Sequence, residues 1–101
     1  MTQYVFLIAA VSEHDDLNSI EDLRRIYTEL RSWHPDGIPT STMAEVAGAS
    51  CFEYELPDGL LDLQALIYGR GLAWGNGWTE YDTFSTMGKR DPLTGEVTWV
   101  F

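Results

Sequence analysis

The sequence predicts a single α+β domain, with a small mixed or antiparallel sheet of about four strands and two main helices packed on one face. Three observations predict it. Two segments have the apolar spacing of helices, and four have the composition or alternation of strands, in the order β-α-(α)-β-α-β-β. The length of 101 residues leaves room for one hydrophobic core, so residues 1–101 are expected to form one acidic globular domain.

The first expected strand is the continuous apolar run from Tyr4 to Val11. A short apolar run that ends in polar residues is typical of a central strand buried on both faces. The run is too short to cross a bilayer, and no basic residue precedes it, so we expect neither a membrane span nor a signal peptide.

The first helix is expected from Ile20 to Trp33, because apolar residues recur there every three or four positions. Ser19 followed by Asp22 resembles a capping box, and the sequence His-Pro-Asp-Gly at 34–37 ends the helix. Residues 38–50 fit either a short helix or a stretch that leads directly into the next strand.

The second strand is expected from Ser50 to Leu56, where aromatic and acidic residues alternate, so that one face is wet and acidic. The second helix then starts with Asp58 as its N-cap and ends at Gly69 or Gly71. Its expected buried residues are Leu60, Leu63, Leu66 and Ile67.

A glycine-spaced loop is expected from Leu72 to Gly77, and two strands follow it, roughly over Trp78–Met87 and Glu96–Phe101. The segment Asp91–Gly95 joins the two strands. Its proline presets one backbone angle and its glycine allows a positive φ, which is the chemistry of a turn.

The charge of the chain is strongly negative, with 16 acidic against 6 basic residues and a net charge of −10. Nucleic acids and anionic lipids need a basic surface, so we expect no direct contact with nucleic acid or membrane. No basic residue lies between Arg31 and Arg70, whereas six acids do. Such a concentration attracts a cationic partner, although acids also serve solubility alone.

The expected partner-binding residues combine these acids with aromatic anchors. The acids are Glu53, Glu55, Asp58 and Asp62, and the anchors are Trp74 and Trp78. The two tryptophans flank a Gly-Asn-Gly sequence. Both could fold back to seal the core, but we expect one of them to be partly exposed.

No catalytic residue, metal site or cofactor is expected. The single cysteine, Cys51, has acidic neighbours that would raise its pKa, so a half-buried structural thiol is favoured over a nucleophile. The cluster Glu13-His14-Asp15-Asp16 could ligate a divalent cation, but adjacent loop residues rarely converge on one ion, and solvation of the helix start is favoured.

Three function classes remain. The first is a non-enzymatic acidic inhibitor that blocks a basic, nucleic-acid-handling protein in the cytoplasm. Phage-encoded anti-CRISPR and anti-restriction proteins, which act in the host cytoplasm, and nuclease immunity proteins share this general profile. The second is a homo-oligomeric assembly module, such as a homodimer, formed through the apolar strand Val97–Phe101. The third is a small enzyme or ligand-binding domain that uses Cys51, His14 or His34.

Overall fold

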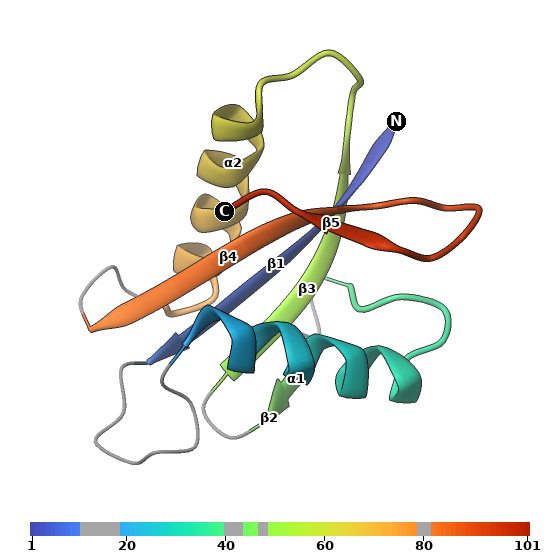
Figure 1. Ribbon diagram of the computed structural model, residues 1–101. Helices are drawn as coiled ribbons and strands as arrows, with labels where there is room; N and C mark the ends of the chain where they lie inside the picture. The colour runs from blue at the N-terminus through green and yellow to red at the C-terminus, as the bar shows by residue number, and fades with distance from the viewer. Residues whose placement is uncertain (11–18, 40–43, 47–48, 79–81) are drawn as a thin grey trace.

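One antiparallel sheet of five strands lies between two helices in the computed structural model, which describes residues 1–10, 19–39, 44–46, 49–78 and 82–101 (Figure 1). The elements are β1 (Thr2–Ala10), α1 (Ile20–Trp33), β2 (Ala44–Val46), β3 (Ala49–Leu56), α2 (Asp62–Gly75), β4 (Thr83–Arg90) and β5 (Val97–Trp99). This confirms the α+β class and the expected order of the main elements. The short β2 adds a strand to the expected four.

Strand β1 is the centre of the sheet, whose spatial order is β2-β3-β1-β4-β5. Phe6 lies opposite Phe52 of β3 on one side and Met87 of β4 on the other. The expected central strand, buried on both faces, is therefore confirmed.

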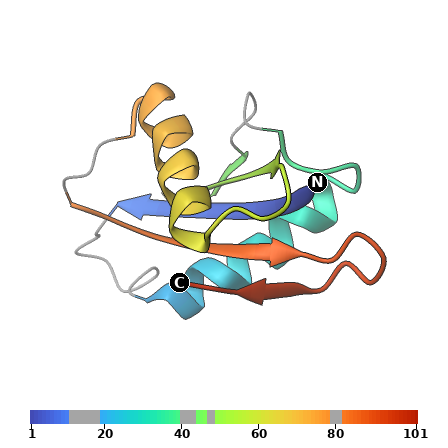
Figure 2. The same cartoon turned by 90° about the horizontal axis from the view of Figure 1, so that it is seen from above.

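The two helices cover opposite faces of the sheet, and the expectation that both pack on one face is wrong (Figure 2). Successive side chains of a strand point to opposite faces. In β1, Val5, Leu7 and Ala9 therefore pack in one cluster with α1. Tyr4, Phe6 and Ile8 pack in a second cluster with α2. A strand that is apolar on both faces needs a cover on each of them.

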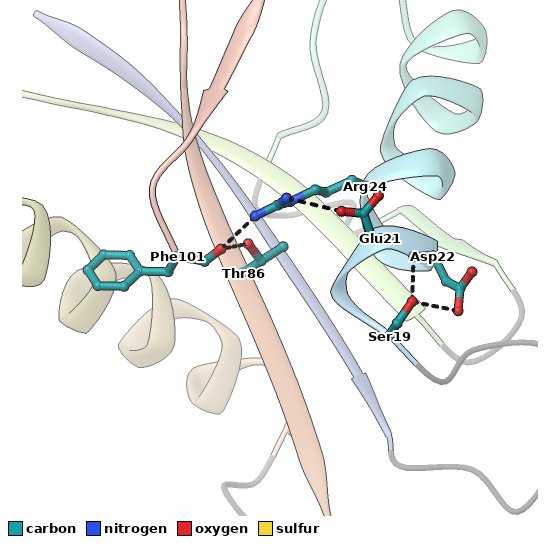
Figure 3. A network of polar contacts seen from close by, with 6 residues as sticks. All are labelled: Ser19, Glu21, Asp22, Arg24, Thr86 and Phe101. Atoms are coloured by element: carbon teal, nitrogen blue, oxygen red, sulfur yellow. Dashed lines mark hydrogen bonds and ion pairs between the residues drawn. The ribbon is translucent and has the colours of Figure 1, made fainter.

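Helix α1 has the expected bounds, Ile20–Trp33. The main-chain N–H of Asp22 donates to Oγ of Ser19 at 3.2 Å, which confirms the N-cap (Figure 3). Leu23, Tyr27 and Leu30 are its buried residues. The apolar stripe stops one turn early, because Trp33 is 64% exposed.

Helix α2 differs from the expectation at both ends. Its N-cap is Leu61 and not Asp58, and the main-chain N–H of Leu61 donates to Oε1 of Gln64 at 2.9 Å. The helix continues through Gly69 and Gly71 as far as Gly75. The segment expected to begin a loop at Leu72 is therefore the last turn of the helix.

Gly69 is needed inside α2 because the helix lies very close to the sheet there. A Cβ atom at this position would lie 2.6 Å from the Phe6 ring and 2.6 Å from the Tyr54 hydroxyl oxygen. The buried residues of α2 are Ala65, Leu66, Gly69 and Ala73. This glycine therefore serves helix–sheet packing and does not end the helix.

The two segments that flank the central strands also have defined pairings. β2 forms a short antiparallel pair with β3, so the part of residues 38–50 that the structure describes leads into a strand. The final strands are shorter than expected and pair antiparallel. The turn at Asp91–Gly95 is confirmed, since Gly95 has φ +77° and its N–H donates to the Asp91 carbonyl oxygen at 2.8 Å.

Candidate functional site

Glu53 lies in a buried ion pair and not on a wet acidic face. Its carboxylate is 3.0 Å from Nε of Arg31 in α1, and it accepts hydrogen bonds from the Ile38 N–H at 3.2 Å and from Nε2 of Gln3 at 2.6 Å. Only 7% of the residue is exposed. The alternation of β3 correctly places Glu53 on the face opposite Phe52 and Tyr54. This face is not open to solvent at Glu53, because α1 and the segment that follows it cover it there.

The other three expected acids are exposed to differing degrees. Asp58 accepts a hydrogen bond from the Thr2 hydroxyl at 2.6 Å and contacts the Met1 amino group at 3.3 Å, and both contacts hold the pKa of Asp58 below its usual value. Asp62 lies 2.8 Å from Nζ of Lys89, which raises the pKa of that lysine. Glu55 is exposed and has no ion pair with any residue that the structure describes. The four acids thus do not form one unpaired patch.

The two tryptophans have different environments. Trp74 is 47% exposed on the last turn of α2. Trp78 is partly buried and packs against the core cluster beneath α2, together with Leu72 and Val100. The prediction that one of the two is partly exposed is confirmed by Trp74, and Trp78 packs on the core.

The most unusual surface of the molecule is the outward side of α2, which is apolar. Leu63, Ile67 and Trp74 recur at helical spacing along it. We define the α2 outer face as the six large apolar residues at positions 60–74 that are between 36% and 69% exposed. They are Leu60, Leu61, Leu63, Ile67, Tyr68 and Trp74. Contiguous apolar surface of this kind marks interaction sites in folded proteins.

Sequence reasoning missed this face because it assigned Leu60, Leu63 and Ile67 to the core. Helix α2 is apolar nearly all round, so hydrophobicity alone does not show which side is buried. The small residues Ala65, Gly69 and Ala73 recur every four positions, and they alone allow the close approach to the sheet. That spacing is the signal that could have identified the buried side.

Cys51 is completely buried, more deeply than the half-buried thiol that the sequence predicts. Burial, together with the nearby Glu53 carboxylate, raises its pKa. A nucleophilic cysteine needs a lowered pKa and access to solvent. The surroundings of Cys51 therefore favour a packing role in the cluster beneath α1.

We expect the Cys51 thiol to react slowly with a thiol reagent such as dithionitrobenzoate in the folded protein. The reaction requires an opening that exposes β3, so the rate at pH 8 should be on the order of a hundredfold or more below that in 6 M guanidinium chloride. The absorbance of the released thionitrobenzoate measures both rates. A native rate equal to the denatured rate would contradict the buried position.

The structure offers little support for the remaining site candidates. Among the residues that it describes, no group of three His, Cys, Asp or Glu side chains is placed to hold a metal ion. The cluster Glu13-His14-Asp15-Asp16 lies outside the described residues. Within the same described ranges, no helix is long and apolar enough to span a membrane.

Comparison of the chain with protein-family models, with curated proteins and with solved structures gives no match.

Proposed function

We propose that this protein is a non-enzymatic binding protein that docks on a basic, nucleic-acid-handling protein through the α2 outer face and blocks its activity. The observation that carries the proposal is the exposure of six large apolar side chains over residues 60–74, four of them on α2 and two immediately before it. Water contact with such side chains is unfavourable by roughly 25 cal/mol for each Å² of apolar surface, and a partner surface removes that cost.

The shape of the surface favours a protein as the partner. Leu63, Ile67 and Trp74 form a row along the helix, and a helix that presents such a row typically lies in an apolar groove of another protein. Tryptophan is also the side chain most enriched among residues that dominate binding energy. We therefore assign Trp74 as the main anchor.

The charge of the chain favours a basic partner. The net charge is −10, and this overall negative charge attracts basic residues that surround a partner's groove. Asp58, in the turn before α2, and Asp62, at its first position, have 73% and 40% of their side chains exposed, although the Met1 amino group and Lys89 balance part of their charge. Charge complementarity of this kind mainly raises the association rate.

In such a partner the apolar groove would adjoin the basic surface that binds nucleic acid, and this protein, bound there, would exclude the nucleic acid. Phage-encoded anti-CRISPR and anti-restriction proteins and nuclease immunity proteins provide the class-level analogy. In this role the protein would act in the cytoplasm of the cell that contains the partner, and in the host cytoplasm if a phage encodes it. It needs no cofactor, metal or catalytic residue for this activity.

A second copy of the chain is the alternative occupant of the same face. Gly71 lies among the outward residues of α2, and the space around its Cβ position is open. The absence of a side chain at Gly71 would let the α2 helix of a second copy approach closely. Two copies would each carry the same net negative charge, however, and their repulsion opposes this pairing at low salt.

The proposal is tested with the double variant Ile67→Ser, Trp74→Ala and a matched control, Trp33→Ala, Leu93→Ser, which also removes two exposed apolar side chains but lies away from α2. Each protein is used to capture partners from a lysate of the source cell at low and at high salt. The partner that the wild type retains is then purified, and its affinity is measured by calorimetry.

We expect the α2 variant to bind the purified partner at least about 30-fold more weakly, since loss of two anchors removes about 2 kcal/mol or more. The control should stay within about threefold, and added wild-type protein should displace nucleic acid from the partner. An unchanged affinity of the α2 variant contradicts the proposal. So does a dimeric wild type that this variant converts to a monomer, because the occupant is then a second copy.

A further inference from the structure

A groove between α1 and the β4–β5 hairpin gathers most of the basic residues of this acidic chain. It has a volume of about 710 Å³ and is lined by Arg24, Arg25, Arg31 and Arg90, with Tyr27 and Trp99 among its other lining residues. Four of the six Lys and Arg residues therefore lie on one groove of a protein whose net charge is −10. A distribution that serves solubility alone would not concentrate them in this way.

Two of the four arginines have close carboxylate partners within the chain, and a third, Arg24, lies 3.8 Å from the carboxylate of Glu21, which also lines the groove. Arg31 pairs with the buried Glu53, and Arg25 pairs with Asp22 one turn earlier in α1. Their charges are largely balanced at short range. The capacity of the groove for a further anion therefore depends on Arg24 and Arg90.

Arg24 is held in place by an oxygen of the last residue, by an aromatic ring and by a loose ion pair. Its Nη2 donates to the main-chain oxygen of Phe101 at 3.2 Å (Figure 3). Its guanidinium also lies over the Trp99 ring, 5.3 Å from the ring centre. The carboxylate of Glu21 is 3.8 Å away, beyond hydrogen-bond distance, and is 84% exposed. The buried Nε–H has no acceptor among the described residues. Arg24 is thus oriented but incompletely satisfied.

Arg90 is oriented by a neutral group. Its Nη1 donates to the Tyr27 hydroxyl at 2.6 Å, and it has no carboxylate partner in the described part of the chain. Tyr27 meets Trp99 edge to face, with ring centres 5.9 Å apart. An aromatic pair therefore lies between two guanidinium groups that contacts within the chain hold in place.

We propose that this groove, which we call the arginine groove, binds a small organic anion that carries a phosphate or carboxylate group and an apolar ring. Guanidinium groups bind these anions through paired hydrogen bonds, and they bind best when their orientation is fixed in advance. The volume of the groove is in the range of small-molecule sites. Trp99 and Val97 supply apolar lining for the ring.

The overall charge of the chain selects small anions over polyanions. A nucleic acid strand would bring many phosphates close to acidic residues outside the groove, and the net charge of −10 would repel it. A ligand with one or two negative charges can lie within the groove, where the arginines dominate. The arginine groove lies on the face of the sheet opposite α2, so this proposal does not depend on the proposed protein-binding function.

The test is an NMR titration of the ¹⁵N-labelled full chain with phenyl phosphate, benzoate, inorganic phosphate and benzyl alcohol. We expect phenyl phosphate or benzoate to shift the Trp99 indole N–H and the Arg24 Nε–H in a saturable way. Comparison of these two probes decides between phosphate and carboxylate. Inorganic phosphate lacks the ring and benzyl alcohol lacks the charge, so each should bind at least tenfold more weakly.

The variants Arg24→Gln and Arg90→Gln should each weaken the better probe at least tenfold. Arg70→Gln is the matched control, because it removes the same charge from an exposed position on α2, and it should stay within twofold. Arg24→Lys retains the charge without the fork of donors and serves if a Gln variant does not fold. Equal weakening by Arg70→Gln, or shifts that do not saturate, would show nonspecific attraction only and overturn the proposal.

Discussion

Glu53→Ala should lower the free energy of unfolding by about 3–5 kcal/mol, the cost of breaking a buried ion pair on one side only. The substitution leaves the Arg31 guanidinium without its carboxylate, which now lies 3.0 Å away. It also leaves the buried main-chain N–H of Ile38 without its acceptor, the Glu53 carboxylate. Urea denaturation followed by tryptophan fluorescence measures the loss.

The neighbouring acid of the same strand provides the control. Glu55 is exposed, so Glu55→Ala should change the free energy of unfolding by no more than about 0.5 kcal/mol. The double variant Arg31→Met, Glu53→Met should be more stable than Glu53→Ala, because it leaves no unpaired charge in the core. A loss below about 1 kcal/mol in the free energy of unfolding for Glu53→Ala would contradict a stabilising role of the Arg31–Glu53 ion pair.

Phe6→Ala should destabilise the protein by a similar amount, about 3–5 kcal/mol, through loss of apolar contacts and creation of a cavity. Phe6 is completely buried in the central strand, and its ring stacks on Phe52 with centres 5.2 Å apart. Its ring also fills the space beneath Gly69, so the cavity would open directly under α2. Urea denaturation again gives the change in the free energy of unfolding.

Hydrogen exchange distinguishes a local effect from a general one in the same variant. We expect the amides of α2 to lose more protection than those of α1, because Phe6 belongs to the cluster on the α2 side of the sheet. Phe84→Ala is the control, since Phe84 is only partly buried and packs on the other cluster. Equal loss of protection in both helices would contradict the separation of the two clusters.

The sequence predicts an element well where local signals agree. For α1, the apolar spacing, the Ser19 cap and the Pro35 stop all indicate the same bounds, and the structure has them. The apolar run Tyr4–Val11 also predicts the central strand, because such a run has few alternatives. Strand β1 begins two residues earlier, at Thr2, and Val11 lies outside the described residues. The same run implies a cover on both faces, which the expected one-sided packing of the helices overlooked.

The sequence predicts less well where the outcome depends on distant elements. Glu53 is buried because Arg31 and Ile38 arrive from other parts of the chain to pair with it, and the alternation of one strand contains no sign of this. The bounds of α2 were wrong because glycine was interpreted as a helix stop, whereas Gly69 permits close packing. For the candidate site, the exposure of Trp74 was anticipated, but the apolar row around it was not.

Helix α2 has small residues on its buried side and large apolar residues on its outward side. The residues that maintain the fold are therefore different from those that a partner would contact. Ala65, Gly69 and Ala73 hold the helix against the sheet, and none of them belongs to the outward row. Substitutions in that row would change little of the core packing, since exposed positions away from caps and turns tolerate change. The same scaffold could therefore acquire a new binding preference through a few outward substitutions, without repacking its interior.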